Sequence, residues 1–201
     1  MLIIGLTGPS GAGKGVVASL LAGYGIPSID TDKVYHDLLI PPSACLDELT
    51  ARFGEGLLSP DRTLDRGALA ALVFSPGHSE DLADLNAMAH RHILNQTRQL
   101  LAVHEAEGAV AVLVDAPQLF ESGFDRECGF ILSVLAPYEL RLARIMERDG
   151  LSEERARARL DASHSDEFFR ERSDAVIFNG DSMDAVAAEV RRLLALWGVT
   201  A

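Results

Sequence analysis

Basic residues are scarce in this chain of 201 residues, which has 18 lysines and arginines but 30 aspartates and glutamates. The formal net charge is −12 at pH 7. Broad binding to nucleic acid or to an anionic membrane needs a basic surface, so this balance argues against both kinds of partner. A local basic pocket for a small anionic molecule is still compatible with an acidic protein.

Cysteine is scarce too, since Cys45 and Cys128 are the only two and lie far apart without a C-x-x-C spacing. That pattern argues against a cysteine-based zinc site and fits a reducing compartment. No apolar run approaches the roughly 20 residues that span a bilayer, and no secretory signal is recognisable. We therefore expect a cytoplasmic protein, and no protein partner can be identified from the sequence.

A glycine-rich stretch, GPSGAGK at 8–14, lies between an apolar run at 2–6 and a helical pattern at 16–21. The order strand, turn and helix with the spacing G-x-x-x-x-G-K is typical of a phosphate-binding loop. The glycines let the backbone bend around an anion, and the N–H groups at the helix start face a phosphate. A glycine-rich turn with a surface lysine is the simpler alternative. The residues predicted to bind the nucleotide here are Gly8, Ser10, Gly11, Ala12, Gly13, Lys14, Gly15 and Val16.

The loop lacks one usual feature, because Gly15 stands where a Ser or Thr hydroxyl normally binds Mg²⁺. The run Gly13-Lys14-Gly15 resembles the G-K-G-T of adenylate and cytidylate kinases, but Val16 replaces the threonine. Mg²⁺ keeps several waters and is held partly by phosphates. Water could therefore fill the space at Gly15, with Asp32 or Asp115 behind it, and the sequence leaves the metal ligands unknown.

Aspartates follow two of the predicted strands. Asp30 and Asp32 lie at the end of a short strand at 27–30, and Asp115 ends a continuous apolar run at 109–115. Open α/β sheets place their ligands beyond the carboxyl ends of the strands, so these carboxylates are candidates for Mg²⁺ or proton chemistry. Capping of the following helix or turn is the alternative role for each.

Arginines gather in one later stretch, six of them between Arg141 and Arg159. On the helix predicted at 137–149, the spacing of Arg141, Arg144 and Arg148 stacks them along one side. Such a cluster could clamp a polyphosphate, or it could be a solvated helix pair with Glu–Arg ion pairs. The phosphate loop favours the clamp.

The overall pattern predicts an α/β protein with a P-loop NTPase fold, a five-stranded parallel sheet and helices on both faces. We expect one domain over residues 1–201, without internal repeats. Its core would comprise about 1–42, 109–137 and 174–201, with a helical substrate-binding insertion at about 43–108 and a small arginine-rich lid at about 138–173.

The order of the motifs resembles the dephospho-CoA kinase family over nearly the whole length. The matching pieces are IDTD at 29–32, FG at 53–54, LDRGAL at 64–69 with VF at 73–74, VDAPQLFE at 114–121, RIMERD at 144–149 and DAVIFNG at 174–180. The resemblance implies a P-loop kinase that transfers the ATP γ-phosphate to the ribose 3′-hydroxyl of dephospho-CoA, the last step of CoA synthesis. ATP and Mg²⁺ are then the expected cofactors.

The resemblance also implies roles for single residues. Asp32 would be the general base, while Lys14, Arg144 and Arg148 would bind and neutralise the phosphoryl groups. The adenine would lie near Asn179 and Gly180. The positions implied on the substrate side are Asp32, His36, His90, Pro117 and Phe120.

Several residues depart from the family pattern. Besides Gly15, Arg91 replaces the proline after His90, and Gln118 replaces the first leucine of P-L-L. His36 stands where the family usually has arginine. These changes keep two alternatives open: a kinase of another small nucleoside or nucleotide, and a nucleotide-binding homologue without turnover.

Overall fold

The computed structural model describes residues 1–75, 79–180 and 182–199. The chain forms two compact units, one of Met1–Asp30 with Leu101–Ala201 and one of Thr31–Leu100. In the described part of the chain, none of the helices has both the length and the apolar character needed to cross a bilayer.

The first unit contains one sheet of five parallel strands, as the sequence predicts, in the order β2-β3-β1-β4-β5. The strands are β1 (Leu2–Thr7), β2 (Ser28–Asp30), β3 (Ala111–Asp115), β4 (Phe130–Leu135) and β5 (Ala175–Phe178). The central strands read as nearly continuous apolar runs because both faces of a parallel sheet are covered. The carboxyl ends of all five strands therefore meet at one edge of the sheet.

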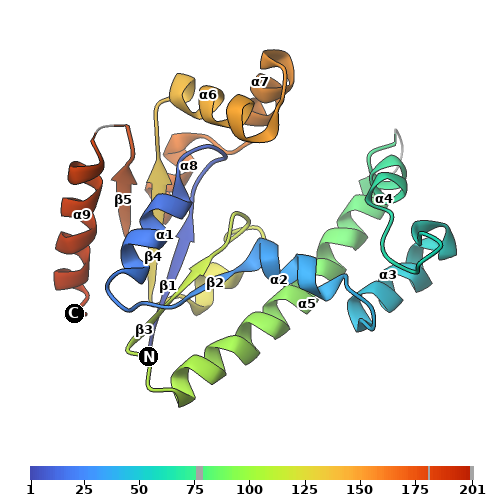
Figure 1. Cartoon of the computed structure of the whole chain (residues 1–201), viewed down its shortest axis with the longest axis horizontal. Helices are drawn as coiled ribbons and strands as arrows, with labels where there is room; N and C mark the ends of the chain where they lie inside the picture. Colours follow the sequence, from blue (N-terminus) through green and yellow to red (C-terminus); the bar gives the residue numbers. More distant parts are fainter. Residues whose placement is uncertain (76–78, 181, 200–201) are drawn as a thin grey trace. The chain divides into compact units, whose positions relative to one another are not determined.

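Two helices, α1 (Lys14–Ala22) and α9 (Met183–Leu196), cover one face of this sheet (Figure 1). Their buried residues, such as Val17 and Val190, belong to the same apolar cluster as Ile4 and Leu6 of β1. On the opposite face, Leu119 lies directly over Gly5. The short 3₁₀ helix η2 (Phe124–Glu127) follows Leu119, and α8 (Asp166–Arg172) contacts β4. The sheet is thus covered on both faces, as predicted.

Two further helices of the first unit, α6 (Tyr138–Asp149) and α7 (Glu153–Asp161), pack on each other (Figure 1). Leu142 and Ile145 of α6 and Leu160 of α7 form their own small apolar cluster. The segment carries the predicted arginine cluster.

The second unit is built from helices in the described residues, with one isolated bridge between Leu58 and Leu64. The elements are α2 (Thr31–Leu38), α3 (Ala44–Phe53), the 3₁₀ helix η1 (Glu55–Leu57), α4 (Arg66–Val73) and α5 (Ser79–Ala106), whose last residues belong to the first unit. Side chains begin two of these helices: Ser43 Oγ accepts from Leu46 N at 3.1 Å, and Asp65 Oδ1 accepts from Ala68 N at 2.9 Å. Such caps satisfy N–H groups that have no partner within the helix.

Candidate functional site

The glycine-rich stretch forms the connection between β1, which ends at Thr7, and α1, which begins at Lys14. Gly13 is the N-cap of α1 and has a left-handed backbone with φ of 93°. The loop is tight, because Ala12 N donates to Pro9 O at 3.2 Å and Lys14 Nζ donates to Gly8 O at 3.0 Å. The loop thus lies between a strand and the start of a helix, as the motif predicts, and anion binding by the N–H groups at the start of α1 stays a prediction.

Two side chains from far along the chain hold the carbonyl groups of this loop. Asn179 Nδ2, just after β5, donates to Ala12 O at 2.8 Å. Arg144 Nη1, on α6, donates to Gly11 O and to Ala12 O, each at 3.2 Å. Asn179 is only 3% exposed, and its own N–H donates to Leu135 O at 2.7 Å at the end of β4. The loop is thus fastened to the carboxyl edge of the sheet.

Three further arginines of the cluster contact carboxylates of their own segment, and two of the three share Asp149. Arg148 donates to both oxygens of Asp149, at 2.7 and 2.8 Å, and Arg159 Nη1 lies 2.7 Å from Asp149 Oδ2. The hydrogen bonds from Arg148 hold the pKa of Asp149 below its ordinary value. Arg157 Nε pairs with Glu153 Oε1 at 2.9 Å, as in a solvated helix pair.

The side chain of Arg141, also on α6, has a different partner from those of Arg144 and Arg148. The helical spacing predicts that all three side chains lie along the same side of α6. The Arg141 side chain is buried, and Nη2 lies 3.5 Å from Asp166 Oδ1 at the start of α8. The guanidinium also lies 5.8 Å from the centre of the Tyr138 ring. The guanidinium of Arg144 donates to the loop, whereas Arg141 lies against Gly11 of the loop with its backbone.

Carboxylates gather where the predicted strands end. Asp30 of β2 and Asp115 of β3 are directly paired in the register, and Asp115 also pairs with Leu6 of β1, just before the loop. Asp32 is the second residue of α2, which begins the second unit directly after β2. Within the described ranges, no three His, Cys, Asp or Glu residues are grouped so that they could hold a metal ion.

The positions implied on the substrate side are divided between the units. Pro117 and Phe120 follow β3 in the first unit: Pro117 O accepts from Thr7 Oγ1 at 3.4 Å, and the Phe120 ring meets Phe168 edge-on at 5.4 Å. His36 lies in α2 and His90 in α5, both in the second unit. These assignments stay predictions.

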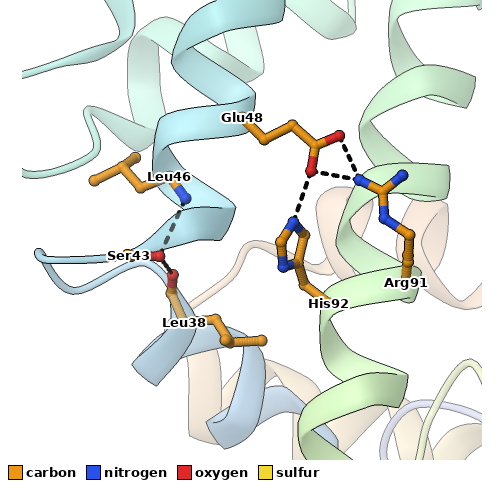
Figure 2. A network of polar contacts seen from close by, with 6 residues as sticks. All are labelled: Leu38, Ser43, Leu46, Glu48, Arg91 and His92. Carbon is orange, nitrogen blue, oxygen red and sulfur yellow. Dashed lines mark hydrogen bonds and ion pairs between the residues drawn. The ribbon is translucent and has the colours of Figure 1, made fainter.

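In the second unit, Glu48 of α3 lies between Arg91 and His92 of α5 (Figure 2). Arg91 donates to both carboxylate oxygens, and His92 Nε2 lies 2.7 Å from Oε2. These hydrogen bonds lower the pKa of Glu48, and the one from Arg91 has the larger effect. Arg91, which departs from the family pattern, thus anchors the turn of α5 that carries His90.

Sequence reasoning missed one cluster on the first unit. The ring of His164 stacks on Phe168 with centroids 3.8 Å apart, and its Nε2 lies 2.8 Å from Glu121 Oε1. Arg172 lies over the same Phe168 ring at 4.1 Å. The adjacent aromatics Phe168 and Phe169 in an otherwise polar stretch were the available signal.

The comparison with known proteins covers nearly the whole chain. The family model described as dephospho-CoA kinase matches residues 2–184. Dephospho-CoA kinase from Corynebacterium glutamicum is 36% identical over 97% of this chain and 96% of its own length. The enzyme of that name from Corynebacterium diphtheriae is 39% identical over 96% of both chains. The solved structure of dephospho-CoA kinase from Campylobacter jejuni is 28% identical, covers 96% of this chain and 95% of its own, and has a TM-score of 0.70.

Proposed function

The chain belongs to the dephospho-CoA kinase family, and on this premise we propose that it transfers the γ-phosphate of ATP to the ribose 3′-hydroxyl of dephospho-CoA. The products are ADP and CoA. The observation that carries the proposal is the phosphate loop, whose carbonyl groups are held by Arg144 and Asn179. A match along nearly the whole chain favours this reaction over the two alternatives, another small-molecule kinase and a homologue without turnover.

The phosphoryl group in flight needs electrostatic stabilisation more than a covalent bond to the protein. Phosphoryl transfer passes through a state in which charge spreads over the transferred oxygens, so positioning and electrostatics dominate catalysis. Lys14 and the N–H groups at the start of α1 bind the β- and γ-phosphates. Arg144 and Arg148 neutralise the developing charge, which requires Arg148 to exchange its contact with Asp149 for a phosphate oxygen.

The acceptor hydroxyl must lose its proton as its oxygen attacks phosphorus. Asp32 accepts that proton as general base, a role that suits a carboxylate just after the carboxyl end of a parallel strand. His36, His90, Pro117 and Phe120 contact the acceptor, and Gly180 lies close to the adenine.

The carboxylates present fit Mg²⁺, which prefers oxygen ligands and retains several waters. Apart from its chain neighbours and the nearby backbone of α1, a Cβ at Gly15 would meet no atom within 4 Å, so this position leaves room for water where a hydroxyl is usual. Asp115 and Asp32 would hold such waters, and the bound ion would neutralise charge on the phosphates. The proposed binding partners are the small molecules ATP and dephospho-CoA, and the proposed location of the protein is the cytoplasm.

The test is an ADP-release assay with ATP, Mg²⁺ and dephospho-CoA in which the product mass is checked. We expect CoA from the wild-type chain. Asp32→Asn should lower kcat by about 10²-fold or more, the usual scale for losing a general base, with ATP affinity unchanged. Asp37→Asn, an exposed carboxylate on the same helix, is the matched control and should keep full activity.

The alternatives give different results in the same assay. ADP release only with another nucleoside acceptor would favour a different small-molecule kinase. ATP binding without ADP from any acceptor would favour a homologue without turnover. Full activity in Asp32→Asn would leave the reaction in place but remove Asp32 as its base.

A further inference from the structure

The side chain of Asn179 lies against the phosphate loop, at the opposite end of the sequence. Its Nδ2 donates to Ala12 O at 2.8 Å. A Cβ on Gly13 would come within 2.1 Å of the same nitrogen, so the amide packs directly on the Gly13 backbone. The two loop residues that Asn179 touches are those immediately before Lys14.

We propose that Asn179 is a positioning residue for the triphosphate, acting through the loop rather than through the base of the nucleotide. A phosphate-binding loop works only when its N–H groups face the anion and its carbonyl oxygens face away. A carbonyl oxygen turned toward the phosphates would repel them. Asn179 holds the Ala12 carbonyl in the outward orientation, and Arg144 supports the same oxygen at 3.2 Å.

Asn179 is suited to this task because it is itself fixed. It directly follows β5, and its N–H donates to Leu135 O at the end of β4. The side chain is almost fully buried, so its amide can donate to Ala12 with little competition from water. The contact joins residues 167 positions apart, which couples the loop to the last strand of the sheet.

Direct binding measurements with two ligands separate this role from contact with the adenine. The probes are Mg·ATP and inorganic tripolyphosphate, which has the phosphates but no base. In Asn179→Ala we expect the Kd of both ligands to rise by the same factor, about tenfold or more, where tenfold corresponds to about 1.4 kcal/mol. Asn179→Leu keeps a similar volume but has no donor and no charge, and it should give the same joint rise if the alanine variant folds poorly.

The matched control is Asp174→Ala. Asp174 Oδ2 accepts from Ile131 N at 2.7 Å, which joins the segment before β5 to β4 at the amino end of the same two strands. This variant should lose stability without a change in either Kd. A rise confined to ATP in the Asn179 variants would overturn the inference in favour of a base contact.

Unchanged affinity for both ligands in the Asn179 variants would also overturn the inference, and so would a wild-type chain that does not bind tripolyphosphate. The inference rests on the proposed function only in taking ATP as the nucleotide. Because the experiment uses no acceptor, a failure of dephospho-CoA phosphorylation in the wild-type chain would not be mistaken for a failure of the Asn179 assignment.

Discussion

Two glycines of the phosphate loop, Gly13 and Gly15, should respond in opposite ways to the same substitution by alanine. Gly13 has φ of 93°, and a Cβ there would lie 2.1 Å from Asn179 Nδ2. Gly15 is the second residue of α1 and has no left-handed backbone, and a Cβ there would meet no atom within 4 Å apart from its chain neighbours and the nearby backbone of α1. The two substitutions, Gly13→Ala and Gly15→Ala, together test whether the loop is packed as closely as the contacts indicate.

The magnitudes follow from these contacts. A non-glycine residue in the left-handed region costs about 1–2 kcal/mol. If Asn179 moves aside for the new methyl group, Ala12 O loses its buried donor at a further cost of about 1–3 kcal/mol. Gly13→Ala should therefore lower the free energy of unfolding by about 2–5 kcal/mol. Gly15→Ala should raise it by about 0.5–1 kcal/mol, because alanine loses less backbone entropy in a helix.

Thermal unfolding measures both effects directly. At about 2–4 °C per kcal/mol for a chain of this size, Gly15→Ala should raise Tm by about 1–4 °C. Gly13→Ala should lower Tm by about 4–20 °C and weaken ATP binding. A Gly13→Ala protein as stable as the wild type would refute the close packing of Asn179 on the loop, and a clear loss of stability in Gly15→Ala would refute the open space beside α1.

Three further outcomes follow from the structure. Gly15→Ser should fold normally and lower the Mg²⁺ concentration needed for half-maximal activity, because it adds the missing hydroxyl; an unchanged Mg²⁺ dependence in a metal titration would contradict this. The lowered pKa of Glu48 means that its pairing stabilises the fold above pH 4.5, its ordinary value, and that this stabilisation is lost as the pH falls through the lowered value. The Tm difference between wild type and Glu48→Gln should therefore shrink below pH 4.5, and a constant difference would count against the pairing. Burial raises the pKa of the Cys45 thiol to about 11 and that of Cys128 to about 12, so iodoacetamide at pH 8 should modify both slowly in the folded protein and rapidly in urea, as followed by mass spectrometry.

Strong local patterns made most of the fold predictable. The apolar runs at 130–135 and 175–178 coincide with β4 and β5. The apolar run before Asp115 begins at Ala109, whereas β3 begins at Ala111, because Val110 is 68% exposed and lies before the paired strands. The helix α8 was not predicted, since seven residues dominated by charged side chains carry no apolar periodicity.

The contacts around the site were harder to predict than the motif itself. The spacing of Arg141, Arg144 and Arg148 predicts a common side of α6, yet the three contact α8, the loop and Asp149 respectively. Long side chains reach different partners from neighbouring helical positions, and local acceptors such as Asp149 compete for them. The contact of Asn179 with Ala12 depends on the strand order, which no local pattern contains.

The departures from the family pattern are accommodated locally in this structure, which bears on whether they threaten activity. Arg91 pairs with Glu48 on α3, so it adds a link between helices where a proline would supply no donor. The backbone carbonyl of Gln118 accepts a hydrogen bond from Ser122 N at 3.0 Å, a contact that does not depend on the side chain. Gly15 is the second residue of α1, which begins directly after the loop. Of these three changes, only the missing hydroxyl at Gly15 removes a group from the proposed chemistry, so any loss of turnover should be sought first in the Mg²⁺ dependence and not in the fold.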